Sequence, residues 1–279
     1  MLQKHKLVLI LVIFLLGVLS GMILNRTRRS IPKVIHKVYL DRTRTFNIRE
    51  QPRAVLTAHA SWMQMNPEYT VEYYDLRKCE AYLKKHYGIK HLKTFRTIQA
   101  YACKCDFFRY CLLYREGGVY TDWKMQCLTP LREVIKEDTQ WVSAWDYMGG
   151  PHLVGNMSNG FFACVPNHPV LRRAIEIVVQ NVEKKHYGRT SLDVTGPGVL
   201  GRAFVEEYAT WYSNPKLGVM IGDFAIVQSG EIYVLFNKRR FIRVKAPGTS
   251  ADQNWKHGNN YNHFYVNRTM YSEKTLAKE

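Results

Sequence analysis

The chain is poor in acidic side chains and in cysteine. Its 279 residues contain 23 Asp and Glu against 40 Lys and Arg, for a formal net charge of +17, and only six Cys. Such a surplus favours anionic partners, such as nucleic acids, acidic lipid headgroups or phosphorylated small molecules. The basic residues are scattered, however, and no helix-turn-helix, zinc-finger or RNP-type signature is present. We therefore expect no nucleic-acid binding.

The cysteines show no zinc-site spacing. Only Cys103 and Cys105 lie close together, and no second pair follows. The cysteines are therefore either buried as small hydrophobic side chains or joined in one or two disulfides of a lumenal domain. Candidate N-glycosylation sequons at Asn25, Asn156 and Asn267 are compatible with a secretory lumen.

Long apolar runs are absent except at residues 7–24, "LVLILVIFLLGVLSGMIL". As a helix this run spans about 27 Å, enough for a thin bilayer. It exceeds the usual signal-peptide core and lacks a clean A-x-A site, which favours an uncleaved signal anchor over a cleaved signal peptide. We predict a cytoplasmic tail at 1–6, a transmembrane helix at 7–24, a stem at 25–30 and a lumenal domain at 31–279. This describes a single-pass type II protein of the Golgi or endoplasmic reticulum membrane, or of a host membrane for a viral or bacterial chain.

The remainder contains no internal repeat or low-complexity tract and indicates one α/β domain. Residues 31–40 predict a buried strand, 55–67 a helix that stops at a proline, and 69–75 a second strand. This βαβ order predicts a parallel sheet beneath helices. Further helices are expected at these ranges: 76–88, 94–118, 168–188 and 193–209.

One helix, turn and strand carry residues suited to chemistry. Asp106 and Arg109 are three residues apart on one helix face, where they could form a surface ion pair or point together into a site. Gly117 and Gly118 end that helix, and the strand that follows ends at Asp122. We expect Asp106, Arg109, Tyr120 and Asp122 to meet at the carboxyl end of this strand, where open α/β sheets bind ligands.

The segment "CDFFRYCLLYREGGVYTDWK" resembles the central motif of glycosyltransferase family 32, the sugar-binding-region family containing the DXD motif. Its members include fungal initiating α-1,6-mannosyltransferases and, more distantly, clostridial glucosylating toxins. The segments "IPKVIHKVY", "SWMQMNPEYTVEYYD", "NGFFACVPNHPVL" and "TGPGVL" resemble further blocks of the family in matching order. The resemblance runs from about Ile31 to Leu200.

This resemblance implies a GT-A fold and transfer of a hexose, with retention of configuration, from a UDP- or GDP-sugar to a glycan or glycolipid acceptor. It implies that Asp106 and Arg109 bind the donor sugar and that Asp122 is the first Asp of the motif. Tyr120 would line the nucleoside, and His36 would be a packed core histidine or lie at the nucleotide edge. In relatives, Mn²⁺ or Mg²⁺ bridges the motif carboxylates and the donor phosphates, which helps to stabilise the leaving pyrophosphate.

The departure from the family pattern is Lys124, which occupies the place of the second Asp. Three explanations stay open. Lys124 could supply the positive charge to the pyrophosphate, a metal could bind through Asp122 and another donor, or the protein could have lost catalysis and only bind sugars or partners. A silent carbohydrate-binding or scaffold protein is thus the alternative to an enzyme.

Weaker candidates lie further along the chain. His257 is the preferred late ligand for metal or phosphate, chosen over Asp252 and His263. Gly196 and Gly198 in "TGPG" allow close backbone approach, near the acceptor or phosphate or simply at a turn that begins a helix.

Overall fold

The computed structural model describes residues 30–41, 45–146, 155–209, 213–249 and 260–272. The expected tail, the apolar run and the stem up to residue 29, together with Asn25, Asp252 and His257, lie outside these ranges. Within the ranges, no helix is long and apolar enough to cross a membrane.

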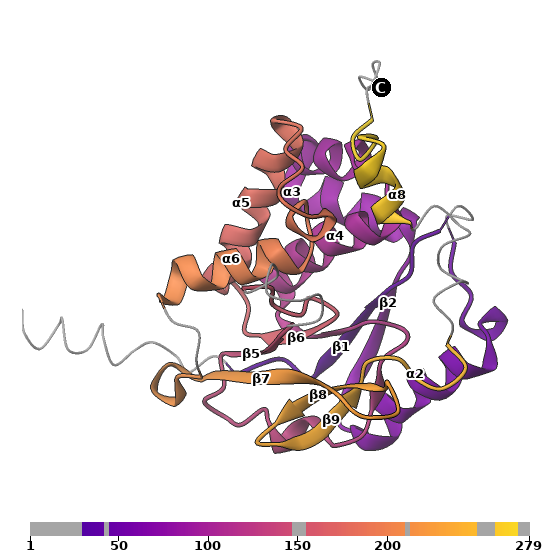
Figure 1. The fold of residues 1–279 in the computed structure, drawn as a ribbon, viewed down its shortest axis with the longest axis vertical. Coiled ribbons are helices and arrows are strands. Elements are labelled where there is room, and N and C mark those ends of the chain that lie inside the picture. The colour runs from indigo at the N-terminus through magenta and orange to yellow at the C-terminus, as the bar shows by residue number, and fades with distance from the viewer. Residues whose placement is uncertain (1–29, 42–44, 147–154, 210–212, 250–259, 273–279) are drawn as a thin grey trace, which may run out of the picture.

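A curled nine-stranded sheet forms the centre of the domain, in the order β2-β1-β3-β6-β5-β7-β8-β9-β4. Figure 1 shows it between a group of helices on one side and α2 (Arg53–Met65) on the other. Its strands are β1 (Val34–Val38), β2 (Thr70–Tyr74), β3 (Gly118–Thr121), β4 (Gln126–Cys127), β5 (Trp141–Trp145), β6 (Phe161–Cys164), β7 (Val219–Ile226), β8 (Ile232–Phe236) and β9 (Arg239–Arg243).

The expected βαβ opening is confirmed, but the expectation of a parallel sheet holds only locally. β1 pairs in parallel with β2 and β3, and β5 pairs in parallel with β7. β6 is antiparallel to both β3 and β5, and β7, β8, β9 and β4 continue as antiparallel neighbours. The sheet is therefore mixed, because β6 runs antiparallel to both of its neighbours.

Helices cover both faces of this sheet and create two hydrophobic cores. On one side lie α3 (Leu76–Thr97), α4 (Tyr101–Glu116), α5 (Pro169–Glu183) and α6 (Pro197–Tyr208), with the short α8 (Tyr261–Val266) near the upper end in Figure 1. α2 (Arg53–Met65) lies on the other side, where Trp62 packs with the strands. All six cysteines are buried and free, as the first of the two alternatives predicts.

The helices around residue 90 match the prediction at one point and differ at another. The expected end of the first helix at Gly88 coincides with a kink, where Gly88 leaves the helical conformation at φ of 73°, and a second helical stretch then carries α3 on to Thr97. Residues 98–100 are extended, because the backbone at Ile98 and Gln99 pairs with the tail at Met270 and Tyr271 instead of continuing the helix. α4 therefore begins only at Tyr101, and this tertiary pairing is invisible in the local pattern.

A fully buried lysine lies beneath the strand that ends at Asp122. Lys37 on β1 is 0% exposed, and its Nζ lies 5.7 Å from the Trp62 ring centroid and 5.3 Å from that of Trp123. Burial lowers the pKa of Lys37 from 10.5 to about 7, a shift that Asp122 opposes. The ammonium thus lies against the faces of two indoles and has no hydrogen-bond partner in the described part of the chain.

We predict that Lys37→Met stabilises the fold near neutral pH. Below pH 7 the lysine is protonated in both the folded and the unfolded chain, so the full cost of burying its charge is present. Between pH 7 and 10.5 the unfolded chain binds the extra proton, so wild-type stability rises with pH relative to the variant. We expect the variant's free energy of unfolding to be higher by about 5 kcal/mol at low pH, and the gain to vanish toward pH 10.5.

Urea unfolding at a series of pH values measures this difference. Lys33→Met, which changes an exposed lysine just before the same strand, is the matched control and should change stability by less than about 0.5 kcal/mol. A pH-independent difference between wild type and Lys37→Met would show that Lys37 keeps its proton in the folded domain.

Candidate active site

Arg109 on α4 is the centre of the candidate site. Its side chain is only 6% exposed. Nη1 donates to the Asn159 carbonyl oxygen at 2.5 Å and lies 3.3 Å from Asp122 Oδ1, while Nη2 lies 3.4 Å from Asp106 Oδ1. The guanidinium carbon lies 4.1 Å from the centroid of the Tyr120 ring. One buried cation therefore joins two carboxylates, a loop carbonyl and an aromatic face.

Asp106 is held on both of its oxygens. Oδ1 accepts a hydrogen bond from Asn159 Nδ2 at 2.8 Å, and Oδ2 accepts one from Thr195 Oγ1 at 2.9 Å. Burial raises the pKa of Asp106, while Arg109, Thr195 and Asn159 stabilise its ionised form. With 14% of its side chain exposed, Asp106 is better placed to fix its neighbours than to reach into solvent.

Asp122 presents the accessible carboxylate of the site. Its side chain is 44% exposed, and Oδ1 accepts the hydroxyl of Tyr120 at 2.8 Å. Its backbone N–H donates to the Gly160 carbonyl at 2.8 Å. A Cβ at Gly160 would lie 2.9 Å from Asp122 Oδ2, so a larger residue there would displace the carboxylate. Asp122 is thus fixed at one end and open to solvent at the other.

Two glycines make the reversal from α4 into β3 possible. Gly117 has φ of 67° and Gly118 φ of 93°, both in the region that favours glycine. A Cβ on Gly118 would lie 2.8 Å from the Val34 carbonyl oxygen on β1. This close approach lets β3 pair with β1 and brings Asp122 back to the level of Arg109 on the helix.

The segment that carries Lys124 is fixed at each residue. Trp123 Nε1 donates to Val38 O at 2.9 Å, Lys124 O accepts from Ala246 N at 2.8 Å, and Met125 O accepts from Trp62 Nε1 at 2.7 Å. Lys37 lies against both indoles involved. The backbone on either side of Lys124 is therefore anchored two residues beyond Asp122.

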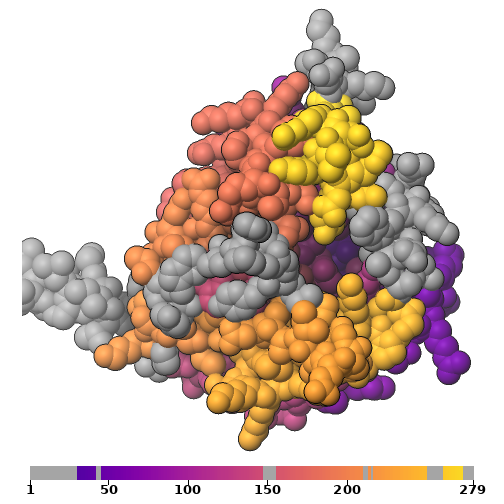
Figure 2. Space-filling model, viewed as in Figure 1, coloured from indigo at the N-terminus to yellow at the C-terminus, as the bar shows by residue number. Residues whose placement is uncertain are grey.

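The half-buried Lys124 lies in an electropositive setting. Burial lowers the pKa of its ammonium, Lys245 lowers it further, and Asp122 opposes both effects. Two ammonium groups close enough to repel each other favour an anion between them. Figure 2 shows the molecule hollowed between α8 and the orange strands of the β7–β9 region, over a purple and magenta floor from the middle of the chain.

The structure brings together Asp106, Arg109, Tyr120 and Asp122, as the spacing predicts. Burial bears on two of the expected roles. Tyr120 is 1% exposed, so it contacts Asp122 and Arg109 and presents almost no surface to a nucleoside. His36 is 3% exposed, its Nε2 lies 3.1 Å from Gly117 O, and burial lowers its pKa to about 4. Of the two roles expected for His36, core packing and a place at the nucleotide edge, this burial fits core packing.

Sequence reasoning missed three polar residues that complete the site. Asn159 and Thr195 bind Asp106, and the Tyr110 hydroxyl accepts from Asn159 Nδ2 at 3.1 Å and donates to Gly196 O at 3.1 Å. The signal was present, since Asn159 begins "NGFFACVPNHPVL" and Thr195 begins "TGPGVL". Neither block reveals by itself which side chain faces Asp106.

The remaining candidates have mixed outcomes. Gly196 is the N-cap of α6, and a Cβ there would lie 3.3 Å from Asp106 Oδ2, so the glycine turn both begins a helix and packs against the site. Asn267 and His263 are exposed. Asn156 is 2% exposed, which leaves no space for a glycan on it in the folded domain.

The donor set for a divalent cation is incomplete in the described part of the chain. No group of three or more His, Cys, Asp or Glu there could hold a metal ion. Asp122 is the accessible carboxylate, both oxygens of Asp106 accept hydrogen bonds, and Lys124 occupies the remaining motif position. These residues do not fit a protein-held Mn²⁺ or Mg²⁺.

Comparison with known proteins identifies the region. Residues 52–141 match the family model described as "Glycosyltransferase sugar-binding region containing DXD motif", and this segment includes Asp106, Arg109 and Asp122. The chain contains a glycosyltransferase domain. The family resemblance seen in the sequence is confirmed, and Lys124 is a departure within the matched segment.

Relatives of this glycosyltransferase domain occur in a virus and in yeasts. The chain is 26% identical over 203 residues to an uncharacterized glycosyltransferase of Acanthamoeba polyphaga mimivirus, covering 73% of this chain and 75% of the relative. It is 28% identical over 191 residues to inositol phosphoceramide mannosyltransferase 2 of Schizosaccharomyces pombe, covering 66% of this chain and 49% of the relative. The chain thus spans about half the length of this yeast relative.

A solved structure shares the fold. The PaToxG glycosyltransferase has a TM-score of 0.50 and 19% identity, covering 65% of this chain and 71% of that chain. Together with the curled mixed sheet, this shows an α/β, GT-A-like fold.

We predict that Arg109→Lys destabilises the glycosyltransferase domain by about 2–4 kcal/mol, because an ammonium cannot bridge both carboxylates and Asn159 O. The control is Arg96→Lys, which alters a bidentate Arg96–Glu80 pair that is 33% and 17% exposed and should cost less than about 1 kcal/mol. Urea unfolding measures both. An equal cost for the two variants would show that Arg109 does not hold the site together.

Proposed function

We propose that this domain is a retaining hexosyltransferase that moves a sugar from a UDP- or GDP-sugar to a glycan or glycolipid acceptor. The observation that carries the proposal is the pairing of an exposed carboxylate, Asp122, with a half-buried ammonium, Lys124, at the carboxyl end of β3. One group suits sugar hydroxyls and the other suits phosphate.

The carboxylate supplies orientation. Asp122 is the most accessible member of the Arg109 cluster, and its free edge can accept hydroxyl hydrogen bonds from a donor sugar. Arg109 and Asp106 are mostly buried. They interact with each other, and Asp106 also accepts hydrogen bonds from Asn159 and Thr195. We therefore assign direct sugar contact to Asp122 and positioning of that carboxylate to Arg109 and Asp106.

The ammonium supplies electrostatic stabilisation. In the transfer, the bond between the anomeric carbon and the pyrophosphate oxygen breaks with its electron pair on that oxygen. The acceptor hydroxyl oxygen bonds to the anomeric carbon on the same face, and its proton passes to the departing pyrophosphate. Negative charge thus grows on the pyrophosphate, where Lys124, backed by Lys245, stabilises it. A fixed cation at this place takes over part of the role that a metal ion has in D-x-D enzymes.

The names of two relatives and the N-terminal sequence support the proposed acceptor class. Two yeast relatives are named for inositol phosphoceramide or its mannosyl derivative, which are membrane lipids. The apolar run at 7–24 would hold the domain at a membrane surface where such acceptors lie, with the domain in the Golgi or endoplasmic reticulum lumen. A glycolipid headgroup or a lumenal glycan is therefore the acceptor we propose.

The first test is Lys124→Asp in the full chain, assayed for hydrolysis of UDP- and GDP-hexoses with EDTA present. We expect wild type to hydrolyse its preferred donor and the variant to lose about 10²–10³-fold of that turnover. Lys90→Asp, which changes a 64% exposed lysine on α3, is the control and should keep wild-type turnover.

Three results would contradict the proposal in different ways. If Lys124→Asp turns over the donor at the wild-type rate, Lys124 takes no part in the reaction. If EDTA abolishes the wild-type activity and Mn²⁺ or Mg²⁺ restores it, a metal ion supplies the positive charge that stabilises the pyrophosphate. Absence of binding and hydrolysis with every donor favours the catalytically silent sugar-binding or scaffold protein.

The second test is Asp122→Asn, which keeps the side chain's size but removes its charge. We expect kcat/KM for the donor to fall by about 100-fold or more, because the Arg109 cluster loses its exposed carboxylate. Asp138→Asn, at an exposed turn before β5, serves as the control. Normal turnover in Asp122→Asn would refute the site assignment.

A further inference from the structure

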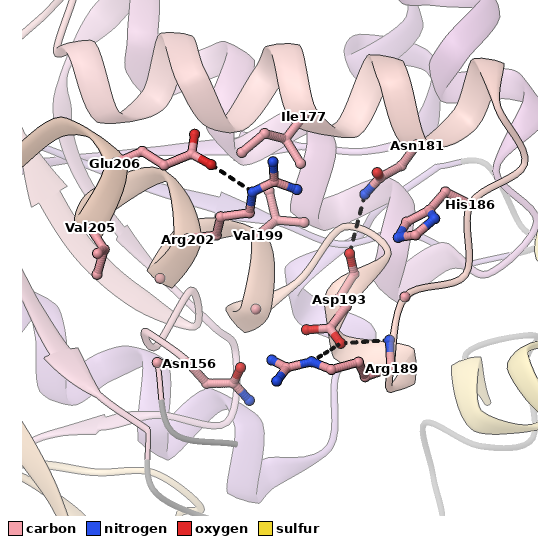
Figure 3. Close-up of a pocket in the computed structure, with 14 residues that line it drawn as sticks. Asn156, Ile177, Asn181, His186, Arg189, Asp193, Val199, Arg202, Val205 and Glu206 are labelled. Atoms are coloured by element: carbon pink, nitrogen blue, oxygen red, sulfur yellow. Dashed lines mark hydrogen bonds and ion pairs between the residues drawn. The ribbon is translucent and has the colours of Figure 1, made fainter. Parts of the chain in front are cut away.

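A second polar cavity lies between α5 and α6, outside the Arg109 cluster. It has a volume of about 350 Å³, near the lower end for small-molecule sites. Figure 3 shows Asn156, Arg189, Asp193 and Arg202 among the side chains around it. Gly155, Gly188, Gly198 and Gly201 also line it, so a good part of its wall is backbone.

The charges of the cavity cancel. Arg202 Nε lies 2.7 Å from Glu206 Oε1, and Arg189 Nε lies 3.7 Å from Asp193 Oδ2. Glu206 also accepts from Arg173 Nε at 2.5 Å. Each arginine therefore has an acidic partner, and a phosphate or carboxylate would have to compete with these acids. The lining suits a neutral ligand with many hydroxyl groups.

An unused donor inside the cavity wall supports this choice. Asn156 is 2% exposed, and its Nδ2 has no hydrogen-bond partner. A buried amide donor of this kind is rare without a ligand or water to satisfy it. Ile177, Val199 and Val205 supply an apolar wall beside it. A sugar ring matches this arrangement, since it combines hydroxyl groups at its edge with C–H groups on its faces.

The cavity and the Arg109 cluster share one wall. Thr195 Oγ1 donates to Asp106 Oδ2, and Gly196 packs against the same oxygen. Asp193, Gly198 and Val199, which flank these two residues in sequence, line the cavity instead. The segment 193–199 thus separates the proposed donor site from a second site suited to sugars.

We propose that this cavity is an acceptor subsite that binds one neutral sugar residue of the acceptor glycan or glycolipid headgroup. Identifying the bound sugar as part of the acceptor rests on the proposed function, but sugar binding in the cavity can be measured without any transfer. Asn156 Nδ2 and the ends of the two ion pairs supply hydrogen bonds to the hydroxyl groups, and the aliphatic wall contacts the ring.

The first experiment measures binding directly on the full chain. Saturation-transfer NMR with the methyl α-glycosides of mannose, glucose and galactose at about 50 mM detects even weak single-sugar contacts, with Kd on the order of 1 mM or more. We expect at least one glycoside to bind wild type. Arg202→Ala should weaken that binding about tenfold, and Val205→Trp, which fills the cavity, should abolish it.

The control is Arg172→Ala. Arg172 and Arg202 are 59% and 57% exposed, each pairs with a glutamate four residues later, and only Arg202 lines the cavity. Arg172→Ala should bind the glycoside as wild type does. Urea unfolding of each variant shows that it is folded. No binding of any glycoside to wild type, or equal binding in Val205→Trp, would overturn the proposal.

The second experiment separates this inference from the proposed function. Donor hydrolysis should be unchanged in Arg202→Ala and Val205→Trp, while KM for the acceptor in the transfer assay rises at least tenfold. Unchanged acceptor KM with lost glycoside binding would mean that the cavity binds sugars but not the acceptor, and overturns the acceptor assignment. Failure of donor hydrolysis in wild type refutes the proposed function alone, because the NMR experiment still decides what the cavity binds.

Discussion

The architecture of the candidate site depends on one buried guanidinium. A cation as enclosed as Arg109 is costly unless its hydrogen-bond donors are satisfied. Here two carboxylates and the carbonyls of Cys105 and Asn159 lie against those donors, and the Tyr120 ring packs against the guanidinium. These partners come from α4, from β3 and its end, and from Asn159, two residues before β6. Burying Arg109 therefore fixes the relative positions of three elements, and the exposed edge of Asp122 is positioned as a result.

The same construction explains why the carboxylates of this site are not equivalent. Asp106 is enclosed, and its oxygens are occupied by Asn159 and Thr195. Asp122 is 44% exposed and shares only one oxygen with Tyr120 and Arg109. Lys124 follows on a backbone anchored by Trp62 and Trp123, whose faces bury the ammonium of Lys37. The same anchored segment thus carries both the accessible carboxylate of Asp122 and the ammonium of Lys124, whose pKa Asp122 raises.

The sequence predicted the first βαβ unit and the meeting of Asp106, Arg109, Tyr120 and Asp122, because both follow from local periodicity and a glycine turn. It did not predict the antiparallel β6, whose pairing with β3 depends on contacts between distant segments. Tyr120 and His36 illustrate a second limit. Their chemistry suits ligand binding, but a strand residue's face and depth are decided by the sheet around it, and both are sealed inside. Asn159 and Thr195 were missed for the same reason, since nothing local indicates that they converge on Asp106.

The central claim is that the donor diphosphate is held by Lys124 beside Asp122 without a metal held by the protein. The most direct measurement is a ³¹P NMR titration of UDP and GDP with the full chain in EDTA, comparing wild type with Lys124→Met. The account predicts that wild type shifts the β-phosphate resonance of one nucleotide and that Lys124→Met removes this shift. A wild-type chain that leaves both nucleotides unshifted until Mg²⁺ is supplied in excess of the chelator would contradict it.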